Sequence, residues 1–187
     1  MHKMSATELG FIEDLPIVVK RKYNTAKAGK ALFFSETRLA IIHTGEIPFQ
    51  LRFCPALPKK PIDNRQQHLD SAPPPKPDLF KSPSDALLIA RIPVHDPTHA
   101  LILNKFPVIP QHFIVATIPY KAQTQLLEVE DLQVTYACLK AWEVKTSEHN
   151  VARRLFAFFN SGEHFGASQS HRHVYIALFP LLSETRM

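Results

Sequence analysis

The sequence predicts an α+β fold in which helices pack on an antiparallel sheet. Short aliphatic and aromatic runs follow one another between turns that carry proline, which is typical of consecutive antiparallel strands. A stretch with helical spacing separates the first three of these runs from two more, so the expected order is three strands, a helix and two strands. At 187 residues the chain is expected to form a single domain, 1–187, with a core of its own.

The N-terminal part predicts a helix and then a hairpin. Residues from Glu13 to about Lys30 are mostly compatible with a helix, with Asp14 as the N-cap and Pro16 in the first turn. The two apolar runs within RLAIIHTGEIPFQLRF meet at Thr44-Gly45-Glu46, which favours a β-hairpin.

Residues 58–83 differ in composition from the rest of the chain. They hold seven of the sixteen prolines, including Pro73-Pro74-Pro75, and few apolar side chains. We therefore expect a Pro-rich, extended and mobile loop over 58–85 rather than a part of the core.

The remaining apolar patterns predict the sheet and its helix. The expected strands are ALLIARI (86–92), HALILNKF (99–106), HFIVATI (112–118), LFAFFNS (155–161) and HRHVYIAL (171–178). Before the fourth strand, helical spacing is followed by Leu132, Tyr136, Leu139 and then either Trp142 or Glu143. This spacing predicts one amphipathic helix across EDLQVTYACLKAWEVK.

Composition and charge exclude several functional classes. The formal charge of +5 is mild, which suits a small polyanionic ligand or a solvated surface and is too weak to predict nucleic-acid binding. No run approaches the roughly 18 apolar residues of a membrane span, and the N-terminus lacks the apolar region of a secretory signal. Cys54 and Cys138 match no zinc or redox spacing, so we expect buried, reduced thiols in a cytoplasmic or nuclear protein.

Residues 160–176, NSGEHFGASQSHRHVYI, place two of the five glycines just before a Ser-His-Arg-His run. In Gly166-Ala167-Ser168, small side chains let a ligand approach the backbone, where N–H groups and the serine hydroxyl can hold phosphate oxygens. Because side chains alternate along a strand, His171, His173 and Tyr175 are expected on one face and Arg172 on the other. A neutral imidazole is a competent nucleophile toward phosphorus. The pattern therefore predicts a phosphate site that one histidine attacks.

Two alternatives remain open from these residues alone. An H-x-H pair on a strand is a common metal-binding arrangement, and His164 could supply a third ligand. The histidines could also be polar residues on an exposed edge of the sheet.

Three blocks of sequence together resemble the histidine-triad superfamily, in particular its fungal diadenosine tetraphosphate phosphorylase (ATP adenylyltransferase) branch. That branch has H-x-H-x-Q after a loop like N-S-G-x-x-x-G-[AS]-S, and residues 160–173 match the loop and the two histidines at the same spacing. LILNKFPVIPQHFIVAT (101–117) resembles its L-L-N-K-F-x-x-x-P-E-H strand pair. CPALPKKP (54–61) resembles the stretch that supplies a phosphate-contacting lysine. The resemblance covers about residues 50–180.

The resemblance implies a fold and a reaction. The fold would be the antiparallel sheet with packed helices of the histidine-triad proteins, truncated relative to the family because the C-terminal part is absent. His173 falls on the nucleophile, which would form a covalent AMP-histidine from diadenosine tetraphosphate and release ATP; phosphate would then take the AMP as ADP. The alternative is a catalytically weak or inactive nucleotide-binding module. Tyr175 stands where the family has glutamine.

The resemblance also implies binding residues and partners. The nucleotide-contacting positions fall on Lys60, Asn104, Lys105, Asn160, Gly166, Ala167, Ser168, Gln169, His171 and Tyr175. The expected ligands are ATP, ADP, diadenosine tetraphosphate and phosphate, with no nucleic acid and no membrane as partner. No tightly bound cofactor or metal is expected, although a divalent cation can accompany the nucleotide. The oligomeric state stays open.

Overall fold

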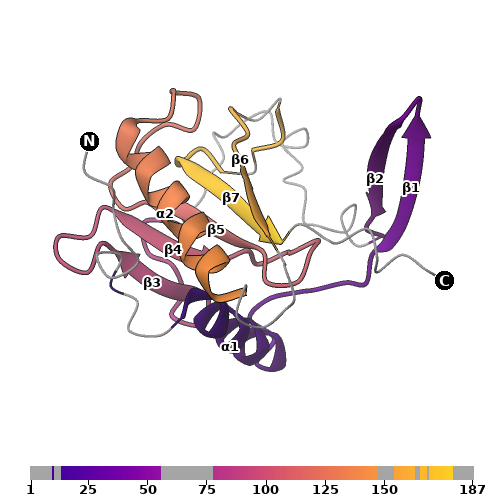
Figure 1. Ribbon diagram of the computed structural model, residues 1–187. Helices are drawn as coiled ribbons and strands as arrows, with labels where there is room; N and C mark the ends of the chain where they lie inside the picture. The colour runs from indigo at the N-terminus through magenta and orange to yellow at the C-terminus, as the bar shows by residue number, and fades with distance from the viewer. Residues whose placement is uncertain are drawn as a thin grey trace, which may run out of the picture.

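The computed structural model describes residues 10, 14–55, 78–146, 154–162, 165–167 and 169–178. Its helices are α1 (Leu15–Ala28) and α2 (Val129–Thr146). Its strands are β1 (Arg38–Thr44), β2 (Ile47–Phe53), β3 (Leu88–Ile92), β4 (His99–Leu103), β5 (Phe113–Thr117), β6 (Leu155–Phe158) and β7 (His173–Leu178). Figure 1 shows α2 lying across one face of the main sheet, with the β1–β2 hairpin standing away from it.

The main sheet has the order β3-β4-β5-β7-β6, and every neighbouring pair is antiparallel. Every residue of β4, β5 and β7 is buried, which explains why these strands read as nearly continuous apolar runs. Three strands, a helix and two strands follow one another in this part of the chain as the sequence predicts. The expected α+β class is confirmed.

The two faces of the sheet are covered differently. One face packs against α1 and α2, with Leu101, Val115 and Ile176 of the sheet joined to Val19 and Val134 of the helices. A smaller cluster lies on the other face, where Ile102, Ile114, Ala116 and Tyr175 pack around Phe80. A loop residue thus covers the face on which the histidines of β7 are expected.

The N-terminal elements confirm the predictions from short-range signals. Pro16 lies in the first turn of α1, and the carbonyl of Asp14 accepts the first hydrogen bonds of the helix from Ile17 and Val18. In the hairpin Thr44 pairs with Ile47, and Gly45 has a φ of 61°, a left-handed conformation that glycine adopts without strain.

The predicted apolar side of α2 is wrong in part. Leu132 and Tyr136 are each 54% exposed. The buried stripe runs instead through Asp131, Val134, Cys138 and Trp142, and so includes one charged and one small residue. Bulky apolar side chains are ordinarily the buried ones of a helix. Here one buried position is occupied instead by the Asp131 carboxylate, which pairs with Arg172 directly before β7.

Two further expectations can be compared with the structure. Within the expected loop over 58–85 only residues 78–85 are described, and Phe80 among them is 7% exposed and belongs to the core. Cys54 and Cys138 are free and buried, as expected, and burial raises the pKa of Cys138 to about 12. In the described part of the chain, neither helix has the length and apolar character that crossing a bilayer requires.

Candidate active site

The structure holds the side chain of His173 as a neutral ring. Its side chain is almost fully buried at the start of β7, where the backbone pairs with Ala116 of β5. The Nδ1 atom lies 2.7 Å from the carbonyl oxygen of His171. Because a carbonyl only accepts hydrogen bonds, Nδ1 must carry the proton, and the lone pair is left on Nε2. Burial lowers the pKa of His173 to about 4, so the ring is neutral at pH 7.

His171 lies two residues before the start of β7, and its ring is held from both sides. Its Nδ1 lies 2.8 and 2.9 Å from the two carboxylate oxygens of Asp78, and its Nε2 lies 3.0 Å from the Thr117 hydroxyl. The ring of Phe80 contacts both histidines, with centroid distances of 5.9 and 4.9 Å. The predicted sharing of one face by His171 and His173 is confirmed.

Gln123 fixes the backbone of His173, a role that no pattern in the sequence indicated. Its amide nitrogen donates to the carbonyls of Asn160 and His173 at 2.8 and 3.0 Å, and its amide oxygen accepts from the His173 N–H at 2.7 Å. The side chain is 1% exposed. A single amide therefore joins the start of β7 to the loop that begins at Asn160.

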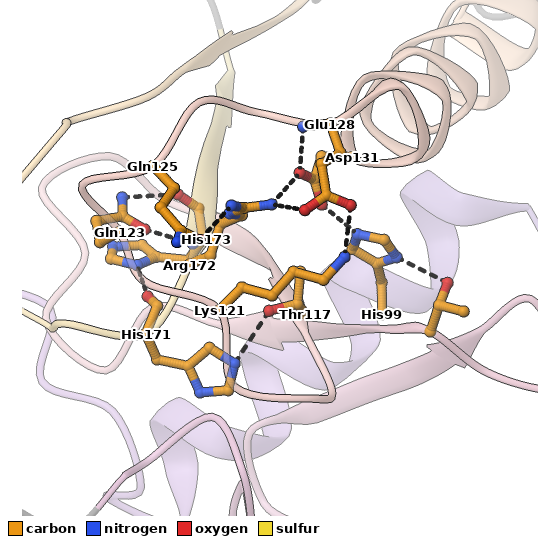
Figure 2. A network of polar contacts seen from close by, with 11 residues as sticks. His99, Thr117, Lys121, Gln123, Gln125, Glu128, Asp131, His171, Arg172 and His173 are labelled. Atoms are coloured by element: carbon orange, nitrogen blue, oxygen red, sulfur yellow. Dashed lines mark hydrogen bonds and ion pairs between the residues drawn. The ribbon is translucent and has the colours of Figure 1, made fainter.

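Arg172 anchors the same segment from the opposite face. Its Nη1 donates to Glu128 at 2.7 Å and to Asp131 at 3.0 Å, and Asp131 also contacts His99 Nε2 at 2.9 Å. Figure 2 shows this network beneath the N-terminus of α2, with Lys121 at its edge. The predicted alternation placed Arg172 correctly but gave no sign of its partners, which lie more than 40 residues earlier, in the first turn of α2 and just before it.

Tyr175 belongs to an aromatic group beside His173. Its ring lies edge-on to His173 at 4.8 Å, stacks on Phe158 at 4.9 Å and lies 5.5 Å from His112. His112 in turn contacts the amide of Asn104, whose Nδ2 lies 3.4 Å from His112 Nδ1. The structure thus connects Asn104 to His173 through His112 and Tyr175. Burial lowers the pKa of His112 to about 4.

Of the other predicted site residues, the structure describes Lys105 and Gln169 outside the aromatic group of Tyr175. Lys105 is exposed, and its ammonium lies over the rings of Phe33 and Phe106 at 5.9 and 5.8 Å. Gln169 lies in the described loop before His171 and is half-buried. Lys60, Ser168 and His164 lie outside the described residues.

The glycine-bearing loop turns back on itself at Asn160. Gly162 and Gly166 have φ angles of +94° and +87°, which L side chains rarely adopt. A Cβ on Gly166 would lie 3.3 Å from the Asn160 side-chain nitrogen, and the Ala167 N–H donates to the Gly162 carbonyl at 3.1 Å. The two glycines are required by the turn itself, as well as by any ligand that approaches it.

The metal alternative can be tested against the described histidines. His171 uses both ring nitrogens in contacts to Asp78 and Thr117. In the part of the chain that the structure describes, no three His, Cys, Asp or Glu side chains gather as a metal site would need.

Residues 9–187 match the family model described as the Ap4A phosphorylase N-terminal domain. The chain belongs to this family. Diadenosine 5',5'''-P1,P4-tetraphosphate phosphorylase 2 of Saccharomyces cerevisiae is 30% identical over 132 residues, which are 71% of this chain and 39% of that protein. Protein APA1 of the same yeast is 30% identical over 170 residues, or 89% of this chain and 50% of that protein. The chain thus spans half or less of the length of these relatives.

Solved structures of an Ap4A phosphorylase have the same fold. Yeast Apa2 in complex with Ap4A superposes with a TM-score of 0.74 at 26% identity, over 90% of this chain and 52% of that one. Apa2 in complex with AMP gives a TM-score of 0.69 at 26% identity, over 90% and 51% of the two chains. The expected resemblance to the fungal phosphorylase branch, in its N-terminal part, is confirmed.

Tyr175 lies where the resemblance implies a glutamine, and its packing leads to a prediction. We expect Tyr175→Gln to lower the free energy of unfolding by about 2–4 kcal/mol, because the variant loses a buried ring and its aromatic contacts. If His173 accepts AMP as the resemblance implies, the rate of that step should not rise, since the aromatic group that flanks this ring is disrupted. Thermal unfolding and single-turnover kinetics measure the two effects.

Tyr175→Phe is the matched control, because it keeps the ring and removes only the hydroxyl. It should melt close to the wild type. A Tyr175→Gln variant that is as stable as the wild type and reacts faster would show instead that the tyrosine is a defect of the site.

Proposed function

We propose that this domain transfers AMP from diadenosine tetraphosphate to His173 and then to phosphate. The observation that carries the proposal is the state of His173: a neutral ring whose Nδ1 is bound to a carbonyl and whose Nε2 is the free lone pair. Among the described residues Nε2 has no hydrogen-bond partner. A buried nitrogen without a partner costs stability, so its retention is consistent with a chemical role.

AMP would be transferred in two steps, first to His173 and then to phosphate. The Nε2 lone pair attacks the α-phosphorus, the N–P bond forms, and the bond to the bridging oxygen breaks with its electron pair leaving on ATP. The ring is then cationic and keeps its Nδ1 proton, so its hydrogen bond to the His171 carbonyl becomes charge-assisted. In the second step a phosphate oxygen attacks the same phosphorus, the N–P bond breaks, and ADP leaves as His173 regains its lone pair.

The loop before β7 is proposed to hold the phosphates and the nucleoside. Gly166 lies beside the Asn160 side chain and has no side chain of its own, and Ala167 has a small one, so a phosphate can approach the backbone of this turn closely. Ser168 and Gln169 follow in the loop as further donors. Asn104 and Tyr175 would contact the nucleotide beside His112.

Cations complete the proposed site. Lys60 and Lys105 are proposed to balance the charge of the polyphosphate and of its transition state. The reaction needs no resident metal, and a divalent cation would arrive with the nucleotide.

A nucleotide-binding module without catalysis is the second candidate. It is favoured by Tyr175, whose hydroxyl cannot reproduce the two donors of the amide that the resemblance implies at this position. In that case the site binds the dinucleotide and forms no covalent product.

Intact mass distinguishes the two candidates. The purified protein is incubated with diadenosine tetraphosphate in the absence of phosphate, so that an AMP adduct accumulates. We expect a mass increase of one AMP per chain, with release of ATP, and its loss as ADP when phosphate is added. Saturable binding of the dinucleotide without any mass change would establish the binding module instead.

A further inference from the structure

Asp78 contacts the candidate site from a position 93 residues before His171 in sequence. Both of its carboxylate oxygens lie within 2.9 Å of His171 Nδ1. Oδ1 also accepts from the backbone N–H groups of Phe80 and Lys81, at 3.0 and 3.1 Å. One carboxylate therefore closes its own turn and binds the first histidine.

The charge state of Asp78 follows from these contacts. Burial alone would raise the pKa of this carboxyl, but the hydrogen bonds from His171 and from the Phe80 and Lys81 N–H groups outweigh it and lower the pKa. Asp78 is ionised at neutral pH, and its hydrogen bond to His171 is charge-assisted.

His171 transmits this contact to the nucleophile. Because both of its ring nitrogens are engaged, by Asp78 and Thr117, the ring presents no nitrogen to a phosphate. Its backbone carbonyl instead accepts the Nδ1 proton of His173, the contact that leaves the lone pair on Nε2. Fixing the His171 ring therefore fixes the group that sets the tautomer of His173.

The turn that Asp78 begins also positions the ring of Phe80 against His173. Phe80 is two residues after Asp78, is 7% exposed, and has its ring 4.9 Å from that of His173. The Phe80 N–H bond to Asp78 links the position of this ring to the carboxylate. His173 is thus oriented through His171 on one side and packed against Phe80 on the other.

We propose that Asp78 is a positioning residue for His173, acting through the His171 ring and through the turn that carries Phe80. The inference rests on the proposed function, in that the reaction served is attack by His173. The described contacts of Asp78 reach His173 only by way of His171 and Phe80. A fixed carboxylate also favours the positive charge that the His173 ring gains on forming its bond to phosphorus.

The test begins with the ring nitrogens and needs no nucleotide. Long-range ¹H–¹⁵N spectra of the full chain should show wild-type His173 as a single neutral tautomer with the proton on Nδ1. In Asp78→Ala we expect a mixture of the two neutral tautomers. Asp85→Asn, which changes an exposed acid seven residues along the chain, should leave the spectrum unchanged. An unaltered His173 tautomer in Asp78→Ala overturns the proposal, whatever the protein does with nucleotide.

Single-turnover adenylylation gives the second readout. Asp78→Ala should slow the reaction about 10- to 100-fold, the loss expected when a hydrogen bond to a charged group is removed, with the dissociation constant of diadenosine tetraphosphate little changed. Asp78→Asn should recover most of the rate, because its amide oxygen can accept from His171 and from the Phe80 N–H. A weaker nucleotide affinity at unchanged rate would contradict a positioning role. A wild-type protein that forms no adduct contradicts the proposed function, and a tautomer change in Asp78→Ala then still supports the positioning of His173.

Discussion

Replacing His173 with alanine should abolish the AMP adduct, a loss on the order of 10⁴-fold or more in the rate of transfer. Two other described histidine rings lie on this face, and neither offers the same lone pair. His171 has both nitrogens engaged, and His112 accepts from the Asn104 amide at Nδ1, which leaves its proton on Nε2, whereas His173 holds its proton on Nδ1 and its lone pair on Nε2. The wild-type adduct should be a phosphoramidate, labile to acid and stable to alkali. Intact mass before and after acid treatment measures both properties.

Matched histidine variants make this result specific. His95→Ala changes an exposed ring in the connection between β3 and β4 and should leave the adduct intact. His173→Gln keeps a polar side chain in the buried position, so its circular dichroism and melting curve report whether folding is retained. An adduct that still forms in His173→Ala would assign the chemistry to another residue.

Patterns of short range were sufficient to predict much of the fold. Alternation along residues 171–178 placed His171 and His173 on one face and Arg172 on the other, because β geometry fixes side-chain direction residue by residue. The hairpin followed from a glycine turn between two apolar runs, and its register confirms it. Such signals need only neighbours in sequence.

The polar contacts that organise the site could not be predicted in the same way. Gln123 reaches His173 across 50 residues, and Asp78 reaches His171 across 93. A glutamine in a turn and an aspartate at the end of a Pro-rich stretch are ordinarily solvated, and nothing local marks them as buried partners. The predicted buried side of α2 was wrong for the same reason. Asp131 is buried because Arg172, 41 residues later, donates a hydrogen bond to its carboxylate.

The buried histidines lead to the second large prediction, a loss of stability in mild acid. Burial lowers the pKa of both His112 and His173 from 6.5 to about 4 in the folded protein. In the unfolded chain each ring protonates near pH 6.5. Between these two values the unfolded state binds more protons than the folded state, so stability rises with pH across this window and falls as pH drops through it.

Each histidine whose pKa is lowered in this way contributes about 3 kcal/mol to stability over the full window. The free energy of unfolding should therefore fall by about 6 kcal/mol between pH 6.5 and pH 4. Asp78 acts in a different range: its lowered pKa gives stability that is present above its unfolded value near 3.8 and is lost as pH falls below it. Urea unfolding at half-unit pH steps separates the two effects. His112→Gln removes one titrating ring outside the proposed chemistry and should remove about half of the slope between pH 6.5 and 4. A wild-type stability that is flat across this window would mean that neither ring is held neutral by the fold, and the lone pair assigned to His173 Nε2 would then lack its protection from protonation.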